Sequence, residues 1–383
     1  MDLNDLPTPA LVLDRGVLAA NIARMNERMR RLGVPLRPHL KTAKSADVAR
    51  LAVAGHPGGI TVSTLHEADY FLERGFADIT YAVGITPARL DAAAALRRRG
   101  ADLKIITDDV GVAGAIAAHG ASFAVLIEID TGGARGGVAP DGAELLEIAR
   151  RLDGAPAVTL RGVLTHAGHS YDCRDVAAMA AVAEEERAGA VMAAERLGAA
   201  GLACPVVSVG STPTARFARD LTGVTEARPG VYMFCDLFQA GIGVCERGDI
   251  GLSVLASVIG QRRADNLLLI DAGALALSKD RSTAELAADC GFGLVCDAVT
   301  GLPHDGLPHG ALKVASVHQE HGIIACRSPI PFEDFPIGAR VRVLPNHACM
   351  TGAAHDAYHV IDGGTEIVAR WPRCNGWGGR LGR

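Results

Sequence analysis

The feature that most constrains the fold of this chain is a regular alternation of short apolar runs with helix-forming segments. Eight such runs occur in order: LRPHLKT, GITVST, ITYAV, DLKIIT, FAVLIEID, RGVLTHAG, PVVSVGS and TEARPGVYMF. Segments rich in alanine and leucine separate them, such as VAAMAAVAEEERAGAVMAAERLG. Buried parallel strands are almost continuously apolar, and each parallel pair needs a crossover connection, which is usually a helix. The alternation therefore predicts an α/β fold of the (β/α)8 barrel type.

The pattern changes beyond about Gly243. Short β-type runs follow there, separated by Gly, Pro, Asp and Asn turns: LSVLASVIGQ, NLLLIDAG, GLVCDAV, ARVRVLPNHAC and AYHVIDGG. Such spacing predicts a second, mainly β domain. The extended segment ALVLD near the N-terminus has no place in the barrel, so we expect it to pair with the β domain. We therefore predict a barrel at residues 16–245 and a β domain formed by residues 1–15 together with 246–383.

Charge and composition exclude several classes of partner. The net charge of −5 and the pI of about 6.2 give no basic footprint for nucleic acid or for an anionic membrane. The first residues, MDLNDLPTPALVLD, are acidic where a signal peptide is positive, and no apolar run is long enough to span a bilayer. The nine cysteines form no CxxC pair, which argues against a disulfide framework. We expect a cytoplasmic protein that acts on small molecules.

The first apolar run contains the strongest candidate for covalent chemistry. In the stretch LRPHLKTAKS, an extended strand would place Arg37, His39 and Lys41 on one face. Burial and neighbouring positive charge both lower the pKa of an ammonium group, which prepares Lys41 to form a Schiff base with an aldehyde. A surface lysine at the end of a strand is the alternative that this stretch alone leaves open.

The seventh run ends in VGSTPT, a pattern typical of an anion site. Gly210 permits close approach of the backbone, and Ser211 and Thr212 supply hydroxyls before a proline that can open a helix. Barrels often bind phosphate after their seventh and eighth strands, and Gly230 follows the eighth. A purely structural turn is the alternative. Together with Lys41, however, the turn suggests pyridoxal 5′-phosphate, which needs both an amine and a phosphate site.

The segment LPNHACMTG contains a candidate metal site. In extended backbone, His347 and Cys349 would face the same side and could bind one ion, expected to be Zn²⁺, with Mn²⁺ or Mg²⁺ as alternatives. Two protein ligands would leave coordination positions open, as in catalytic sites. A buried cysteine beside a hydrogen-bonded histidine remains the alternative reading.

Segments across nearly the whole chain resemble one family. These segments are TPALVLD, RPHLKTAKS, GITVSTLHEA, EIDTGGARGGV, GVLTHAG, VVSVGSTPTA, GVYMF, QEHGI and LPNHAC, in this order. They are similar to the fold-type III pyridoxal phosphate enzymes that comprise D-serine dehydratase, D-threo-3-hydroxyaspartate dehydratase and D-threonine aldolase. The resemblance implies a barrel like the N-terminal domain of alanine racemase, a β domain that includes the N-terminal strand, and a homodimer.

The resemblance also implies roles for individual residues. Lys41 would be the Schiff-base lysine and the base at Cα, Arg135 would contact the phenolic oxygen of the cofactor, and Tyr171 would lie near its pyridine nitrogen. The residues around the phosphate would be Gly210, Ser211, Thr212, Gly230 and Tyr232. The metal ligands would be His347 and Cys349. Further candidates for the catalytic site are His39, His166, His321 and, more weakly, Gln319.

The implied activity is that of a metal-dependent lyase acting on D-configured 3-hydroxy amino acids. Dehydration to a 2-oxo acid and ammonia is the first choice, with D-threo-3-hydroxyaspartate or D-serine as substrate. Retro-aldol cleavage to glycine and an aldehyde is the alternative. Cys349 favours dehydration, because the second metal ligand of the family's aldolases resembles an aspartate. A non-catalytic carrier of pyridoxal phosphate is the alternative from another class, although a carrier has no use for a metal site. Arg281 is a candidate partner for a substrate carboxylate, and a solvated loop arginine is the alternative for this residue.

Overall fold

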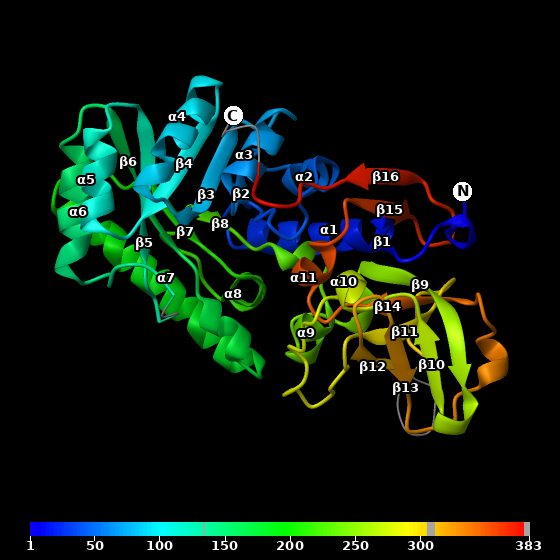
Figure 1. The fold of residues 1–383 in the computed structure, drawn as a ribbon. Helices are drawn as coiled ribbons and strands as arrows, with labels where there is room; N and C mark the ends of the chain where they lie inside the picture. Colours follow the sequence, from blue (N-terminus) through cyan, green and yellow to red (C-terminus); the bar gives the residue numbers. More distant parts are fainter. Residues whose placement is uncertain (133–134, 305–310, 379–383) are drawn as a thin grey trace. The chain divides into compact units, whose positions relative to one another are not determined.

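The chain forms two compact units, seen in a computed structural model that describes residues 1–132, 135–304 and 311–378 (Figure 1). The barrel unit comprises Arg24–Gly230 and the residues from Gly376 onward, and the β unit comprises Met1–Ala23 and Val231–Asn375. The sequence predicted domain limits after residues 15 and 245. These limits stay a prediction. Within the segment EIDTGGARGGV, Gly133 and Ala134 lie outside the described residues.

The barrel unit is built on a parallel sheet of seven strands in sequential order. They are β2 (Ile60–Val62), β3 (Asp78–Gly84), β4 (Asp102–Thr107), β5 (Phe123–Ile129), β6 (Val158–Thr165), β7 (Val206–Val209) and β8 (Glu226–Ala227). The first apolar run closes the ring through isolated parallel bridges, from Leu36 to Ala227 and from His39 to Thr61. Pro38 has no N–H to donate, so this run cannot complete a regular ladder. The predicted eight-stranded barrel is confirmed.

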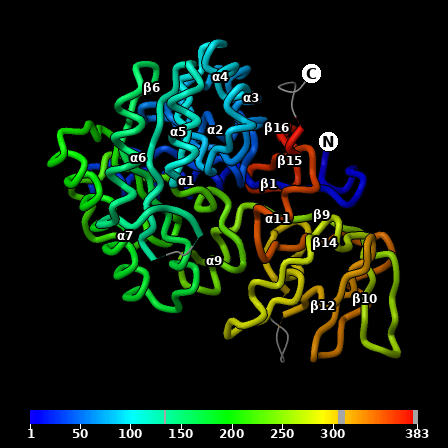
Figure 2. The backbone as a smooth tube through the Cα atoms, turned by 60° about the vertical axis from the view of Figure 1, so that its left-hand side comes forward, coloured from blue at the N-terminus to red at the C-terminus, as the bar shows by residue number. Residues whose placement is uncertain are grey.

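Helices connect the barrel strands and cover their outer side (Figure 2). They are α1 (Arg15–Arg31), which begins in the β unit, then α2 (Ala46–Val53), α3 (Leu65–Leu72), α4 (Leu90–Arg98), α5 (Val110–Ala118), α6 (Ala143–Asp153), α7 (Val176–Ala199) and α8 (Thr212–Phe217). Helix α6 shows why they form, because it buries Leu145, Ile148 and Leu152, which recur at helical spacing. Its opposite face carries charged residues.

The β unit contains a sheet of nine strands in the order β10-β13-β12-β11-β14-β9-β1-β15-β16, with β10 also paired to β9. The strands are β1 (Ala10–Asp14), β9 (Leu252–Arg262), β10 (Leu267–Ile270), β11 (Leu294–Asp297), β12 (Lys313–Val317), β13 (Gly322–Ala325), β14 (Arg340–Leu344), β15 (Ala357–Ile361) and β16 (Ala369–Pro372). Three short helices accompany them, α9 (Leu237–Gly241), α10 (Ala274–Leu277) and α11 (Ala348–Gly352). Strand β1 lies between β9 and β15 (Figures 1 and 2), which confirms the expected pairing of ALVLD.

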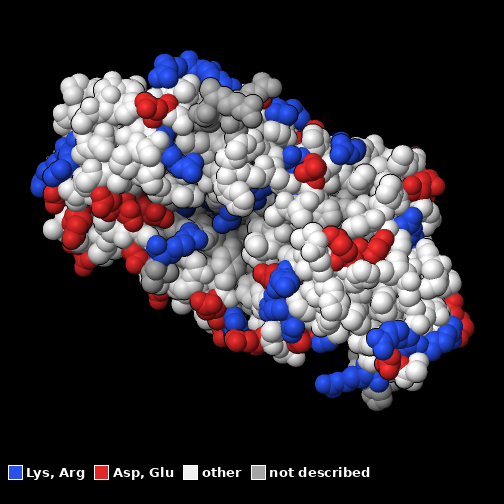
Figure 3. All heavy atoms as spheres, in the orientation of Figure 1, with Lys and Arg blue, Asp and Glu red and all other residues white. Residues whose placement is uncertain are grey.

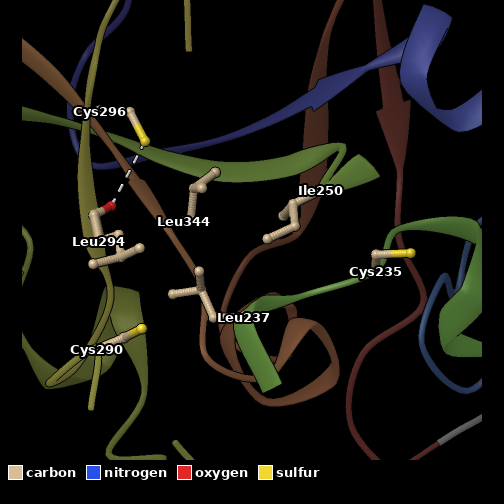
Figure 4. Packing of buried hydrophobic residues seen from close by; sticks show 7 residues of the cluster. All are labelled: Cys235, Leu237, Ile250, Cys290, Leu294, Cys296 and Leu344. Atoms are coloured by element: carbon tan, nitrogen blue, oxygen red, sulfur yellow. Dashed lines mark hydrogen bonds between the residues drawn. The ribbon is translucent and has the colours of Figure 1, made fainter. Parts of the chain in front are cut away.

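A cluster of buried aliphatic and sulfur-containing side chains stabilises the part of the β unit that precedes the candidate metal site (Figure 4). Its members are Cys235, Leu237, Ile250, Cys290, Leu294, Cys296 and Leu344. Burying one leucine or isoleucine side chain contributes about 1.5–3 kcal/mol, and free cysteines behave as small hydrophobes. All nine cysteines are free thiols, as expected from their spacing. The cluster thus fixes Leu344, three residues before His347.

The surface agrees with a protein of small net charge. On the face shown in Figure 3, lysine and arginine side chains are interspersed with aspartate and glutamate. Among the described helices, none has the length and apolar character needed to cross a membrane.

Candidate active site

A cavity of about 310 Å³ lies at the carboxyl ends of the barrel strands. Its lining residues are His39, Lys41, Ser63, Ala82, Val83, Gly84, Glu128, Arg135, Gly136, Leu164, His166, Gly210 and Arg228. Five of the residues predicted from the sequence therefore meet in one cavity: Lys41, His39, His166, Arg135 and Gly210. Loops at this end of a barrel hold the active site in characterised enzymes of this fold, so the cavity is the candidate active site.

Lys41 lies in a turn rather than in a strand. The turn begins after the bridge at His39, and the N–H of Lys44 donates to the carbonyl of Leu40 at 2.7 Å. The prediction that an extended strand carries Lys41 is therefore wrong. A buried ion pair holds the turn, because Lys44 Nζ lies 2.7 Å from Glu67 Oε1 while Glu67 Oε2 accepts the N–H of Ser63. The turn directs Lys41 to the cavity wall.

Arg37 does not supply positive charge to the cavity, contrary to the prediction that it shares a face with Lys41. Its guanidinium forms ion pairs with Asp78 at 2.7 Å and with Glu226 at 2.6 Å, and it is not part of the lining. These carboxylates offset its charge inside the barrel. Besides Lys41, the basic side chains that line the cavity are Arg135, which is exposed, and Arg228, which is buried.

Two histidines of the cavity are held neutral. Burial, followed by the charges of Lys41 and Arg228, lowers the pKa of His39 well below its usual value. Burial also lowers the pKa of His166 to about 3, although a hydrogen bond to the carbonyl of Gly210 opposes this shift. Because that carbonyl only accepts, His166 Nδ1 must carry the proton, at 2.9 Å from Gly210 O. His166 Nε2 is then a hydrogen-bond acceptor.

Sequence reasoning missed Arg228. Its guanidinium donates to the Oγ of Ser208 and to the carbonyl of Thr165, so the buried charge has partners on two neighbouring strands. Burial lowers its pKa to about 10, opposed by the carboxylates of Glu226 and Glu186. An available signal was its place within the eighth apolar run, directly after the residues of strand β8, where barrel strands deliver functional side chains.

Glycines let the strand ends approach each other at the predicted phosphate site. Gly210 has φ +130°, and a Cβ there would lie 2.7 Å from the backbone nitrogen of Arg228. A Cβ on Gly230 would lie 2.8 Å from the carbonyl oxygen of His39. Both positions therefore require glycine.

The two hydroxyl residues of the predicted phosphate site begin helix α8. The Oγ of Ser211 accepts the N–H of Thr214 at 3.1 Å and lies 2.8 Å from the Oγ of Ser170. Thr212, the first residue of α8, is buried. Contacts of Ser211, Thr212 and Gly230 with a phosphate stay predictions.

The remaining sequence candidates are not part of the cavity lining. Tyr171 lies in a short 3-10 helix, with its ring centroid 6.5 Å from that of His166. Tyr232 belongs to the β unit, and burial raises the pKa of its phenol. Gln319 and His321 are exposed in the turn between β12 and β13. Roles for these four residues stay predictions.

The candidate metal ligands meet in a geometry that differs from the prediction. His347 is extended and caps helix α11, but Cys349 lies in the first turn of that helix, so an extended HxC segment is wrong. The two side chains nevertheless form a hydrogen bond. His347 Nδ1 also lies 3.2 Å from Asp280 Oδ2. Burial opposes the charged imidazolium, but the hydrogen bonds to Asp280 and Cys349 raise the pKa of His347 to about 11.

Three further residues hold this loop and were missed from the sequence. Asn346 is buried, and its side-chain amide donates to the carbonyls of Asp280 at 2.9 Å and Gly291 at 2.7 Å. Asp236 accepts the N–H of Ala348 at 3.0 Å, and burial raises the pKa of Asp236 to about 6. Asp280 follows the DAG turn in the segment SKDRS, where the sequence had suggested its neighbour Arg281.

The donor set fits a divalent ion such as zinc. Asp280 accepts from His347 Nδ1, which leaves Nε2 for a metal, and carboxylate-bound histidines are a recurring feature of such sites. Imidazole nitrogen and thiolate sulfur are ligands that zinc prefers. No group of three or more potential ligands occurs within residues 1–132, 135–304 and 311–378, so His347 and Cys349 would leave coordination positions open.

Arg281, the candidate partner for a substrate carboxylate, lies in a surface ion pair. Its guanidinium lies 3.1 Å from Asp289 and is exposed. An arginine already paired on the surface is a poor candidate for a substrate carboxylate.

Comparisons with known proteins agree over the whole chain. Residues 13–237 match the model of the alanine racemase N-terminal domain, and residues 251–361 match a putative serine dehydratase domain. The chain is 50% identical over 382 residues to D-threo-3-hydroxyaspartate dehydratase of Delftia sp. strain HT23, covering 97% of this chain and 98% of that protein. It is 29% identical over 386 residues to D-threonine aldolase of Arthrobacter sp., covering 95% and 92%.

Solved structures extend this likeness to three dimensions. Two variants of D-threo-3-hydroxyaspartate dehydratase superpose with a TM-score of 0.93 at 49% identity, covering 98% of this chain. One has a histidine replaced by alanine, and 97% of its chain is covered. The other has a cysteine replaced by alanine, is in the metal-free form, and is covered over 100% of its length. With its two-domain match and full-length similarity, the chain belongs to the family of alanine racemase-like enzymes that contains D-threo-3-hydroxyaspartate dehydratase, D-serine dehydratase and D-threonine aldolase.

Proposed function

We propose that this protein is a pyridoxal phosphate- and metal-dependent lyase that dehydrates a D-configured 3-hydroxy amino acid. The observation that carries the proposal is the amine of Lys41 on the wall of a cavity of about 310 Å³. D-threo-3-hydroxyaspartate is the first candidate substrate, because the relative that is 50% identical is named for it. D-Serine is the second, since the C-terminal region matches a putative serine dehydratase domain.

Lys41 is the residue that holds the cofactor and moves a proton at Cα. When bound, pyridoxal phosphate supplies an electron sink at Cα, and the metal ion supplies a Lewis acid for the 3-hydroxyl group. A lysine can accept a proton only when its amine is unprotonated. The pKa values of His39 and His166 are lowered, so their neutral imidazoles add no positive charge to the cavity wall that Lys41 shares.

The two arginines of the cavity bind and orient the anionic groups. Arg135 is exposed at the cavity wall and is suited to a carboxylate or a phenolic oxygen, because its guanidinium offers several donors. Arg228 is tied to Ser208 and Thr165 and therefore presents a fixed positive charge. Excluding water from such a site strengthens both interactions.

His347 and Cys349 are the proposed metal ligands, with Asp280 fixing the imidazole tautomer. A parallel supports this assignment. In the two solved variants of the dehydratase, the replaced histidine and cysteine are also two positions apart, and the cysteine variant is in the metal-free form. Neutral imidazole and thiolate are the forms that bind a metal, so metal binding is coupled to proton release and depends on pH.

The overall reaction balances without a further reactant. The Cα proton and the 3-hydroxide leave together as water, and the resulting enamine tautomerises to an imine. Hydrolysis of that imine consumes one water and releases ammonia and the 2-oxo acid. Retro-aldol cleavage instead breaks Cα–Cβ and releases glycine, which makes the two outcomes easy to separate.

The decisive experiment incubates the holoenzyme separately with D-threo-3-hydroxyaspartate, D-serine and D-threonine. We expect ammonia in amounts equal to the 2-oxo acid, and no glycine. Glycine as the main product would instead establish the aldolase reaction, for which the similarity to the Arthrobacter D-threonine aldolase is the supporting observation. Turnover of none of the three would overturn the proposed substrate class.

We also propose that the enzyme is a homodimer, as the family resemblance implies. Light scattering after size-exclusion chromatography checks this, and a mass near 39.7 kDa for the eluted species would contradict it.

A further inference from the structure

Glu186 is a buried carboxylate that the proposed mechanism does not use. It lies on helix α7, with 1% of its surface exposed, behind the wall of the cavity. Its Oε1 accepts two backbone N–H groups, from Ala167 at 2.8 Å and from Gly210 at 3.1 Å, and its carboxylate also bonds the side chain of Thr214. One side chain thus ties the ends of β6 and β7 and the start of α8 to one point.

The same bonds fix the cavity face of these segments. Gly210 donates its backbone N–H to Glu186, and its carbonyl accepts from His166 Nδ1. Ala167, the next residue after His166, is the second donor to Glu186. His166 and Gly210 are therefore held in a closed ring of hydrogen bonds. Within this ring, Glu186 comes from helix α7 and joins the loop after β6 to the loop after β7.

Burying this carboxylate costs free energy that packing alone would not require. Burial raises the pKa of Glu186, and the hydrogen bonds from Ala167, Thr214 and Gly210 oppose that shift. An apolar side chain would leave two buried N–H groups without an acceptor, which costs more than the bonds themselves contribute. The space beside Glu186, Gly210 and Thr214 has a volume of about 10 Å³, about the minimum that one water molecule needs.

We propose that Glu186 is a positioning residue for cofactor binding, which sets the Gly210 turn so that it accepts the 5′-phosphate and fixes the tautomer of His166. This inference rests on the proposed function, because it assumes that the cavity takes pyridoxal phosphate. It predicts an effect on the phosphate end of the cofactor in particular. The aldehyde end, which meets Lys41, depends on a different turn that Lys44 and Glu67 hold.

The test compares the affinity of the full-length apoprotein for pyridoxal 5′-phosphate with its affinity for pyridoxal, which lacks the phosphate. For Glu186→Ala, we expect binding of the phosphorylated form to weaken about tenfold or more, since small misplacements of positioned groups have large effects. Binding of pyridoxal should change less than about twofold on the same basis. Glu186→Gln keeps an oxygen acceptor and should retain most of the preference for the phosphorylated form.

Leu197→Ala is the matched control, because Leu197 is a fully buried residue of the same helix that does not line the space beside Glu186, Gly210 and Thr214. In this control, we expect any loss of affinity to be equal for pyridoxal 5′-phosphate and pyridoxal. An equal loss of affinity for both ligands in Glu186→Ala would overturn the inference and leave the proposed function standing. If Glu186→Ala does not fold, Glu186→Asp is the second variant, because its shorter side chain moves the acceptor away by one methylene group. An unchanged ratio of the affinities for the two ligands in this variant would also overturn the inference. A wild type that binds neither ligand would overturn the proposed function itself.

Discussion

Two partly buried imidazoles, one in each compact unit, have pKa values shifted in opposite directions. His166 faces the barrel cavity and hydrogen-bonds a carbonyl, and its pKa is lowered to about 3. His347 in the β unit hydrogen-bonds the carboxylate of Asp280 and the thiol of Cys349, and its pKa is raised to about 11. Burial lowers the pKa of both, so the difference comes from the partner on the ring nitrogen.

The difference shows how one residue type serves two kinds of site. A carbonyl partner fixes the tautomer of His166 without adding negative charge, so the cavity around Lys41 gains no imidazolium. A carboxylate partner makes the imidazole of His347 a better ligand for a metal cation, because the carboxylate offsets positive charge at the ring. We expect the cavity to hold the cofactor and the His347 loop to hold the metal. Each of these assignments can be tested by a separate substitution.

The largest expected effect comes from removing the amine of Lys41 from the cavity in the barrel unit. Lys41→Ala should lower kcat by about 10³-fold or more, because it removes both the covalent attachment and the base. It should also abolish the near-visible absorption of the bound cofactor while the metal content stays unchanged. Lys279→Ala, at an exposed lysine, is the control. Retention of the absorption band in Lys41→Ala would contradict the assignment.

The second prediction concerns the β unit, where Cys349 is a proposed metal ligand. Cys349→Ala should lower kcat by about 10²-fold, within the range known for residues around a metal, and should reduce the bound metal measured by elemental analysis. The absorption of the cofactor should persist. Cys326→Ala, at a partly exposed cysteine elsewhere in the β unit, should do neither. Full activity of Cys349→Ala would remove this cysteine from the metal site.

A smaller effect is expected when the partner of His347 is changed. Asp280→Asn keeps the shape of the side chain but loses the negative charge at Nδ1, and should weaken metal affinity about tenfold. Titration with a competing chelator measures this. Asp289→Asn changes an exposed aspartate that pairs with Arg281 and Lys313, and should leave metal affinity as in the wild type. Equal affinities for all three proteins would refute the role of Asp280.

The smallest effect concerns stability and pH. Because the folded pKa of His166 lies below the ordinary value of about 6.5, the unfolded chain binds the extra proton first. The contribution of His166 to stability is therefore present above about pH 6.5 and is lost as the pH falls toward about 3.

His166→Asn keeps a donor for Gly210 O but cannot titrate. The free energy of unfolding, measured with denaturant at several pH values, should fall less steeply below pH 6.5 in this variant. Other buried groups, such as Asp236, titrate in both proteins, so the difference between the two curves isolates His166. Parallel curves would show that His166 is not held neutral in the folded state.

The candidate site was predictable only where its residues lie within recognisable segments. The Lys41 stretch, the Gly210 turn and the HAC segment each carry a local pattern, and the resemblance named residues in all three. The local backbone was predicted less well, since Lys41 lies in a turn and Cys349 in a helix. Periodicity describes which residues are apolar, but hydrogen bonds from distant segments decide where a strand stops.

Glu186, Arg228 and Asp280 show what the sequence did not reveal. Each is a charged residue in an unremarkable local context, and charge on a helix or loop is usually solvated. Each acquires its role from a partner tens of residues away: Gly210 for Glu186, Thr165 for Arg228, His347 for Asp280.

By itself, the sequence determined the barrel and the β domain, and it offered the candidates for the reactive groups. It did so because apolar periodicity and residue chemistry are local properties. Only the tertiary structure decided which charges face the cavity. Arg37 is offset by Asp78 and Glu226, whereas the charge of Arg228 reaches His39 and His166 in the cavity. Electrostatic energies depend on distance and burial, and folding sets both by bringing remote residues together.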